Sequence, residues 1–310
     1  MRKRFCILFF LYSLVLSAQD GIVKSVMLDS VMVSAVSAGF SVEDFVDYVK
    51  SDTSFYQGFK NLRYYTHQYT SELEVFDVKN NSVGFLYRQG HYEVADNKLV
   101  VKVDSSFNDG RIYNRRGKYR YYTPEFFDYI FFPKDTLEVS KYSSKEESNN
   151  GDSQNERNER DAKVLIFNPG SVEVEKSGSK KEKLAVFDES MQKYYDYIIS
   201  KKTYKDTLEC YKFVCRMKSD LSEDEQEEVL IRELVSYFDR NTFNVVYRKY
   251  IMQYDYWLID LNVIVDVEMG YAHGKLIPSF INYKGYWDIP FSKPEIAEFK
   301  LWNSDFIITD

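Results

Sequence analysis

The chain has 310 residues, with 48 acidic and 41 basic side chains, so its formal net charge is −7. An acidic chain of this kind lacks the broad positive surface that nonspecific binding of nucleic acid requires. Tyrosine and phenylalanine are abundant, with 27 and 23 residues, whereas glycine and proline are sparse, with 13 and 6. Such a chain can bury a large aromatic core, and its length suits one large domain or two small ones.

The first eighteen residues have the layout of a secretory signal peptide. Three basic residues precede an apolar stretch, residues 5–16, and the small residue Ala18 ends the segment. The alternative, a membrane anchor, would need a longer apolar stretch to cross a bilayer. We therefore expect removal of residues 1–18 and an exported protein in the periplasm or associated with the outer membrane, with no transmembrane span after cleavage.

Residues 19–140 are predicted to form an amino-terminal α+β portion. Its first part, residues 22–35, alternates apolar and polar side chains and favours a strand or an extended arm. Helices are expected to start near Ser41, which opens a capping-box pattern, and near Thr53. A third helix start is predicted at Thr123, which precedes a proline. Strands are predicted between the second and third helices, at residues 67–78, 83–90, 98–105 and 111–122.

The last of these strands, residues 111–122, interleaves cationic and aromatic side chains. In a cytosolic protein this pattern would suggest RNA or single-stranded DNA. In an exported acidic protein it is interpreted as a hairpin that turns at Arg116-Gly117, with the cations stacked on tyrosines. A site for an anionic glycan or a lipid headgroup is the alternative.

Residues 141–161 are predicted to form a disordered, acidic and polar loop. The segment contains one aromatic side chain and no aliphatic one, so it cannot bury enough surface to offset the entropy of ordering. It could separate two domains or interrupt one. We favour an interruption and expect residues 19–310 to form one folded unit.

Residues 162–310 are predicted to form an antiparallel β-meander with one helix. Residues 163–167 favour a short buried strand, and Asp188 is expected to cap a helix over residues 188–200. The acidic run 222–228 is typical of a solvated loop. The strands of the meander are predicted at residues 206–218, 228–238, 243–254, 256–269 and 276–287.

The predicted strand over residues 256–269 has the longest alternation in the chain. One of its faces is apolar, and a sheet must cover such a face with a helix, another sheet or a ligand. The opposite face carries several polar side chains, among them Asp260, Asn262 and Asp266. A permanently filled core is the alternative to a ligand-binding wall. The candidate wall residues are Trp257, Ile259, Leu261, Val263 and Val265.

No signature of catalysis or of metal binding stands out in the sequence. The histidines His67, His91 and His273 lie far apart and have no partner at ligand spacing. Cys210 and Cys215 are five positions apart in one predicted strand, so their side chains should point to opposite faces and a disulfide between them is disfavoured. We therefore predict no enzymatic activity, no metal ion and no cofactor.

The carboxyl-terminal region resembles the lipoprotein carriers of the LolA/LolB type. The similar elements are residues 204–213 and residues 237–247, where one strand ends at the turn Asp239-Arg-Asn-Thr242 and the next follows at once. The resemblance covers residues 163–306, less than half of the chain, and implies an unclosed β-barrel that wraps apolar ligands. Residues 28–35 are similar to segments of Bacteroidota envelope proteins.

The expected fold is α+β, with a curved, mainly antiparallel sheet that forms an open half-barrel and has helices packed on one face. The resemblance implies a non-enzymatic protein that binds a hydrophobic ligand or a lipoprotein acyl chain in the cell envelope. The alternative is a structural or protein-interaction component of the envelope with no small-molecule ligand. Neither function involves nucleic acid as a partner.

Overall fold

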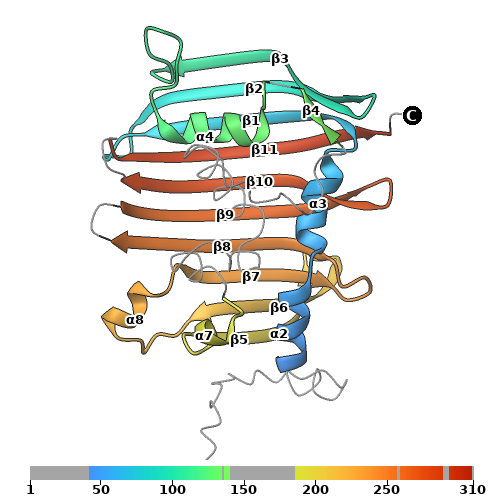
Figure 1. Ribbon diagram of the computed structural model, residues 1–310, viewed down its shortest axis with the longest axis vertical. Coiled ribbons are helices and arrows are strands. Elements are labelled where there is room, and N and C mark those ends of the chain that lie inside the picture. Colours follow the sequence, from blue (N-terminus) through green and yellow to red (C-terminus); the bar gives the residue numbers. More distant parts are fainter. Residues whose placement is uncertain (1–41, 135, 140–185, 257–258, 289–292, 309–310) are drawn as a thin grey trace, which may run out of the picture.

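The computed structural model describes residues 42–134, 136–139, 186–256, 259–288 and 293–308 (Figure 1). Several predictions lie outside these residues. They are the signal peptide over residues 1–18, the extended segment 22–35, the loop 141–161 and the short strand 163–167.

In the residues that the structure describes, eleven strands form one antiparallel sheet in the order β4-β3-β2-β1-β11-β10-β9-β8-β7-β6-β5. β1 pairs with β11, so strands from the start of the chain extend the sheet that the carboxyl-terminal meander builds (Figure 1). Within the described part of the chain, β4 and β5 are the two edges and do not pair with each other, so the sheet is open. The strands are β1 (Thr66–Phe76), β2 (Ser82–Ala95), β3 (Lys98–Gly110), β4 (Leu137–Glu138), β5 (Tyr195–Tyr204), β6 (Leu208–Met217), β7 (Ile231–Asp239), β8 (Val245–Tyr256), β9 (Ile259–Ala272), β10 (Lys275–Asp288) and β11 (Glu295–Ile307).

Alternation along each strand gives the sheet two faces, which we call inner and outer. The inner face carries Val263 and Val265 of β9, and the outer face carries Ile264 and Asp266. From residue 261 to residue 268 the odd-numbered side chains are more buried than the even-numbered ones. The alternation that the sequence predicts for this strand is therefore confirmed over the described side chains.

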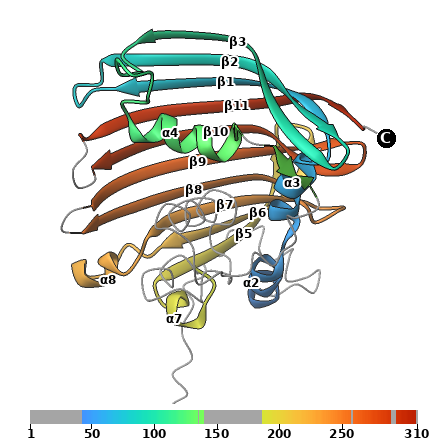
Figure 2. The ribbon, with the colours of Figure 1, turned by 45° about the horizontal axis from the view of Figure 1, so that its top comes forward.

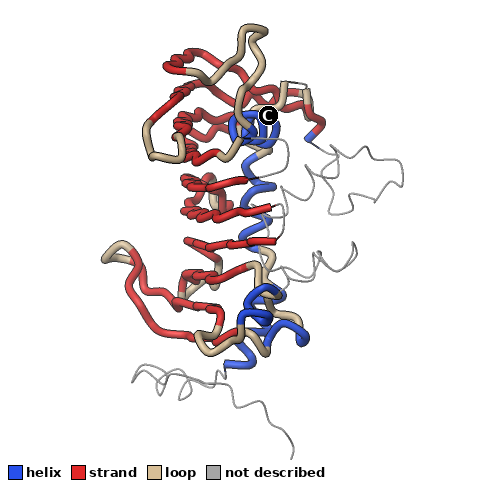
Figure 3. Tube along the Cα trace, turned by 90° about the vertical axis from the view of Figure 1, so that its left-hand side faces the viewer, coloured by secondary structure: helices blue, strands red, loops and turns tan. Residues whose placement is uncertain are grey.

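The longer helices contact the inner face through aromatic side chains. In α2, Phe45 packs against Phe213 and Phe238, with ring centroids 5.8 and 5.5 Å away. In α4, Phe127 stacks on Phe299 at 4.2 Å. Figures 2 and 3 show α2, α3 and α4 on the same side of the sheet, which Figure 3 presents with its strands nearly end-on. The described helices are α2 (Val42–Ser51), α3 (Ser54–Leu62), α4 (Tyr122–Phe131), α7 (Glu189–Gln192) and α8 (Glu223–Glu227).

The prediction of a helix over residues 188–200 is wrong. Only α7 is helical there, and β5 begins three residues after it. Buried side chains in β5 alternate at Tyr195, Tyr197 and Ile199, which is the period of a strand. The same apolar residues also fit one side of a helix, and pairing with β6 decides between the two because strand formation depends on neighbouring strands.

Two further local predictions change. The acidic run 222–228 contains the short helix α8, whose first turn is closed by a capping box between Ser222 and Glu225. Residues 111–122 form no regular strand, although a single bridge pairs Tyr113 with Tyr119. Between these tyrosines Gly117 has a φ of +73°, so the predicted turn at this position is confirmed.

Candidate functional site

The candidate site is the inner face of β9 and of its two neighbouring strands. Leu261, Val263 and Val265 of the predicted wall share this face, and the two valines are only 2% and 1% exposed. Trp257 lies outside the described residues, and Ile259 is described only through its backbone, which begins β9. The structure therefore brings three predicted wall residues together, and their role in ligand binding stays a prediction.

Two tyrosines that the sequence analysis did not single out complete the wall. Tyr250 of β8 and Tyr283 of β10 lie directly opposite Val265, one on each side. Burial raises the pKa of both phenols well above its ordinary value, so both are neutral. The wall thus combines aliphatic surface with uncharged hydroxyl groups. The sequence does indicate that both tyrosines lie on a buried face, because each alternates with another apolar residue of its strand. These residues are Met252 in β8 and Ile281 in β10.

A glycine shapes the wall beside Val263. Gly285 pairs with Val263, and a Cβ at this position would lie 1.9 Å from the hydroxyl oxygen of Tyr283. The Tyr283 ring therefore occupies the space above the glycine. Trp287 donates a hydrogen bond from Nε1 to the same hydroxyl oxygen, which fixes the position of the ring.

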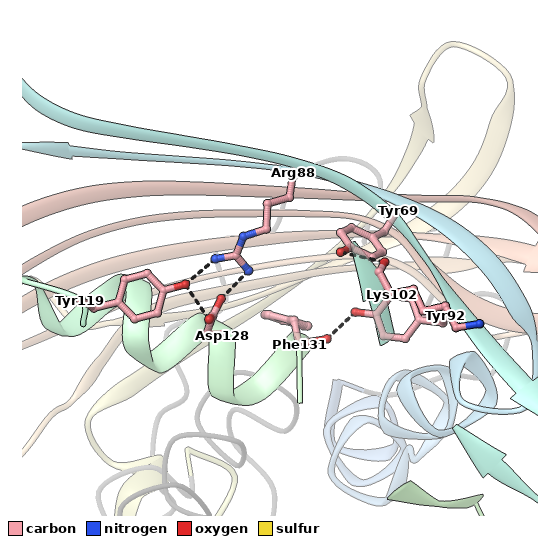
Figure 4. Close-up of polar contacts among 7 residues, drawn as sticks. All are labelled: Tyr69, Arg88, Tyr92, Lys102, Tyr119, Asp128 and Phe131. Carbon is pink, nitrogen blue, oxygen red and sulfur yellow. Dashed lines mark hydrogen bonds and ion pairs between the residues drawn. The ribbon is translucent and has the colours of Figure 1, made fainter. Parts of the chain in front are cut away.

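A partly buried polar cluster holds α4 against the sheet (Figure 4). The Arg88 guanidinium donates to Asp128 Oδ1 and to the Tyr119 hydroxyl, and Tyr119 donates to Asp128 Oδ2, each at 2.5 Å. Burial alone would lower the pKa of Arg88, but the Asp128 carboxylate and Tyr119 outweigh that effect and the pKa is raised. Arg88 is therefore a charged group that depends on its partners, because a buried charge without one is costly.

Both ends of α4 are also tied to the sheet by hydrogen bonds. The buried Glu295 carboxylate of β11 accepts from the backbone N–H groups of Tyr122 and Thr123 at 2.9 and 2.7 Å. An anion in this position complements the unpaired N–H groups and the dipole of the helix. At the other end, the Tyr92 hydroxyl donates to the Phe131 carbonyl at 2.6 Å (Figure 4). These bonds hold α4 over the inner face on one side of the wall.

On the other side of the wall, α3 approaches β9 and β10 closely. A Cβ on Gly58 would lie 2.3 Å from Met269 Cε and 3.5 Å from the Leu276 carbonyl oxygen. The absence of a side chain at Gly58 therefore allows the helix to sit against the sheet. The Asn61 side chain adds a hydrogen bond to the same carbonyl of Leu276 at 2.9 Å.

A buried arginine lies where α3 crosses β8. The Arg248 guanidinium is 4.4 Å from the centre of the Phe55 ring, and its Nε donates to the Ser236 hydroxyl at 3.0 Å. Burial lowers the pKa of Arg248 to about 10, so the side chain is charged at neutral pH. Asp52, 4.0 Å away between α2 and α3, supplies the opposite charge. These contacts fasten the two helices to the inner face.

The described chain offers neither a metal-binding cluster nor a reactive cysteine. Within the described ranges, no three His, Cys, Asp or Glu side chains come together in a way that could hold a metal ion. Cys210 and Cys215 are free and buried, and burial raises the pKa of Cys210 to about 11 and that of Cys215 well above its ordinary value. Both are therefore thiols rather than reactive thiolates. In the parts of the chain that the structure describes, no helix has the length and hydropathy needed to cross a membrane.

No protein-family model and no curated protein matches the sequence. A protein described as an outer membrane lipoprotein-sorting domain, from Vibrio parahaemolyticus, aligns over 86% of this chain and 91% of its own, with 7% identity and a TM-score of 0.26. A LolA superfamily protein from Nitrosomonas europaea covers 83% and 93%, with 8% identity and a TM-score of 0.24. A DUF1329 family protein from Desulfovibrio piger covers 88% and 92%, with 12% identity and a TM-score of 0.23.

At these identities and TM-scores the three alignments do not by themselves assign a fold or a function. They give no support to a Bacteroidota origin. The class of the protein follows from its own structure: a single open antiparallel sheet whose inner face is apolar and carries helices fastened by buried polar groups.

Proposed function

We propose that this protein is an exported, non-enzymatic binder of a hydrophobic ligand, such as a lipid or a lipoprotein acyl chain, in the cell envelope. The ligand would lie along β9 on the inner face, against the row of Leu261, Val263 and Val265. Trp257 and Ile259 would extend this row toward the start of the strand. The proposed location is the periplasm or the outer membrane, with which the protein would be associated.

The size of the inner face carries the proposal. Ten long strands about 4.8 Å apart, each about 12 residues long at about 3.3 Å per residue, give a face of roughly 45 by 40 Å. A ten-residue helix is about 15 Å long and about 10 Å wide, so α2, α3 and α4 together cover about a quarter of that area. Val263 and Val265 are only 2% and 1% exposed, so an acyl chain would have to take the place of the part of the chain that covers them.

The energetics of such a ligand are favourable. Burial of an acyl chain contributes about 0.8 kcal/mol per methylene group. A chain of about twelve methylenes would gain roughly 10 kcal/mol before the costs of association are subtracted. The neutral phenols of Tyr250 and Tyr283 place no charge beside the chain, so the wall needs no ionic partner from the ligand.

A second candidate is a structural or protein-interaction component of the envelope with a filled core and no small-molecule ligand. The burial of Val263 and Val265 favours it, because both are almost completely covered in the chain without a ligand. The two candidates differ in one measurable property, which is whether an apolar molecule can enter the inner face.

Uptake of a fluorescent fatty acid by the full chain tests the proposal. Val263→Trp places an indole on the inner face and should abolish probe binding. Ile264→Trp places the same side chain on the outer face one residue along and should leave binding unchanged. Thermal unfolding of both variants checks that each is folded.

Two results would refute ligand binding. One is a wild-type protein that takes up no probe and carries no lipid detectable by mass spectrometry after purification. The other is equal probe affinity in wild-type protein and Val263→Trp. A filled core also predicts that Val263→Trp lowers the free energy of unfolding by about 1–3 kcal/mol through overpacking, with no probe bound to any variant.

A further inference from the structure

We propose that the loop between β3 and α4 binds the surface of an anionic lipid membrane. This loop, residues 111–121, is called the cationic loop below. It follows the end of β3 that the two-residue edge strand β4 does not reach, at one end of the long axis of the molecule (Figures 1 and 3). The proposal does not depend on ligand binding by the inner face. The cationic loop contains no acidic residue and five exposed cationic side chains, which are Arg111, Arg115, Arg116, Lys118 and Arg120.

The charges of the cationic loop are not compensated by other side chains. None of its five cations forms an ion pair or lies over an aromatic ring within the described part of the chain. The expectation that they stack on tyrosines is therefore wrong. Elsewhere on the sheet some solvent-exposed cations are paired with carboxylates, as in Lys205–Glu268 at 2.6 Å and Arg240–Glu209 at 3.1 Å, whereas the cationic loop gathers five unpaired cations within eleven residues. In a chain with a net charge of −7, such a concentration of free positive charge indicates a partner with negative charge.

The cationic loop is held in one shape by its own backbone. The Asn114 side chain accepts from the backbone N–H groups of Arg116 and Lys118 at 2.8 and 3.2 Å, and its backbone N–H donates to the Lys118 carbonyl at 2.8 Å. Ile112, which is 1% exposed, anchors one arm in the core. Tyr119 anchors the other arm through Arg88 and Asp128 (Figure 4). The cations are therefore presented on a fixed support, and binding costs little backbone entropy.

The surroundings of the cationic loop fit a lipid surface. Tyr122 and Tyr129 of the adjacent helix α4 are 36% and 50% exposed. Tyrosine rings are enriched at the level of lipid headgroups, and arginine and lysine close to an anionic bilayer are attracted to its surface. A flat membrane can approach this end of the long axis and contact the loop before it reaches the strands at the other end (Figure 1).

Nucleic acid fits the cationic loop less well. Binding of single strands requires aromatic faces on which bases can stack. Tyr113 and Tyr119 instead face each other, with ring centroids 5.0 Å apart, and the Tyr119 hydroxyl is already bonded to Asp128. A long polyanion would also have to run along an acidic protein beyond the eleven residues of the loop.

Pelleting of the full chain with phospholipid vesicles tests the proposal. We expect binding to vesicles of phosphatidylcholine that contain phosphatidylglycerol, and much weaker binding to vesicles of phosphatidylcholine alone. Binding to vesicles of phosphatidylcholine alone measures any apolar association between other segments of the chain and the lipid. Binding to the anionic vesicles should fall as salt rises, because the Debye length shortens from about 10 Å at 0.1 M to about 3 Å at 1 M.

The decisive variant is Arg115→Gln/Arg116→Gln/Lys118→Gln, which keeps every backbone bond of the loop. Each cation near an anionic surface contributes about fivefold to binding, so the loss of three should weaken it about 100-fold. A matched triple variant removes the same charge from exposed lysines elsewhere and should change binding about twofold at most. Its substitutions are Lys98→Gln, Lys202→Gln and Lys275→Gln.

Three results would overturn the proposal. The first is no binding of wild-type protein to the anionic vesicles at low salt. The second is an equal loss of binding in the two triple variants, which would show a general charge effect. The third is tight binding of wild-type protein to a single-stranded oligonucleotide or a sulfated glycan with none to the vesicles. Equal unfolding temperatures of the variants confirm that any difference arises at the surface.

Discussion

His67 should make the protein lose stability in acid, over a range that its environment defines. The side chain is 1% exposed and lies between the rings of Tyr92 and Phe306, with centroids 4.4 and 5.1 Å away. His67 Nδ1 is 2.8 Å from the Tyr65 carbonyl oxygen, which can only accept a hydrogen bond. Nδ1 therefore carries the proton of the neutral ring, and Nε2 has a free lone pair. Among the described residues, no group bonds to Nε2. Protonation would therefore create a buried charge with no acceptor.

Burial lowers the pKa of His67 from 6.5 to about 4. The unfolded chain takes up this proton near pH 6.5, whereas the folded chain remains neutral until about pH 4. The contribution of His67 to the free energy of unfolding is therefore fully present above pH 6.5. It decreases as the pH falls and is lost by about pH 4. A shift of about 2.5 units at 1.36 kcal/mol per unit gives a loss of roughly 3 kcal/mol.

Urea unfolding above pH 6.5 and near pH 4 measures the effect. Carboxylates also titrate in this range, so the comparison is between wild-type protein and His67→Phe, which keeps a flat ring between Tyr92 and Phe306. The variant should lose roughly 3 kcal/mol less than wild-type protein on acidification. Gln68→Phe, on the outer face, controls for the added ring and should keep the wild-type dependence. An identical loss in wild-type protein and His67→Phe would refute the reasoning.

Two further experiments test the packing of the inner face. Arg88→Met should lower the free energy of unfolding, measured in urea, by about 3–5 kcal/mol because it leaves the Asp128 carboxylate without its partner. The double variant Arg88→Met/Asp128→Leu should recover part of that loss. A double variant that loses the sum of both single effects would contradict this. Gly90→Ala should cost about 1–3 kcal/mol, seen as a lower unfolding temperature, because its Cβ would lie 2.0 Å from the Lys102 carbonyl oxygen. An unfolding temperature equal to that of wild-type protein would show that β2 and β3 can separate at no cost.

The site was predictable to the extent that it depends on alternation within one strand. Leu261, Val263 and Val265 follow from a period of two, which is a local property that the chain shows without any knowledge of its neighbours. Tyr250 and Tyr283 belong to the same wall only because β8 and β10 pair with β9 in a particular register. Register depends on contacts across the whole sheet, so these two residues could not be placed beside Val265 from the sequence.

The same limit explains the error over residues 188–200. Tyr195 and Ile199 are four positions apart and fit a helical stripe, yet they also fit an alternating strand with Tyr197 between them. Local propensity does not separate these two patterns in a short apolar segment. The hydrogen bonds that β6 offers to β5 decide the outcome, and β6 is known as a neighbour only in the folded chain.

The sequence by itself determined the alternating strands of the meander, the turn at Gly117 and the run of cations around it, because each is a property of neighbouring residues. Only the tertiary structure decided that β1 pairs with β11 and so joins both ends of the chain in one sheet. It also decided that Arg88 of β2 bonds to Asp128 of α4 and to Tyr119 between the helix and the sheet. These contacts join segments far apart in the chain, and they form only when the apolar inner face draws strands and helices together.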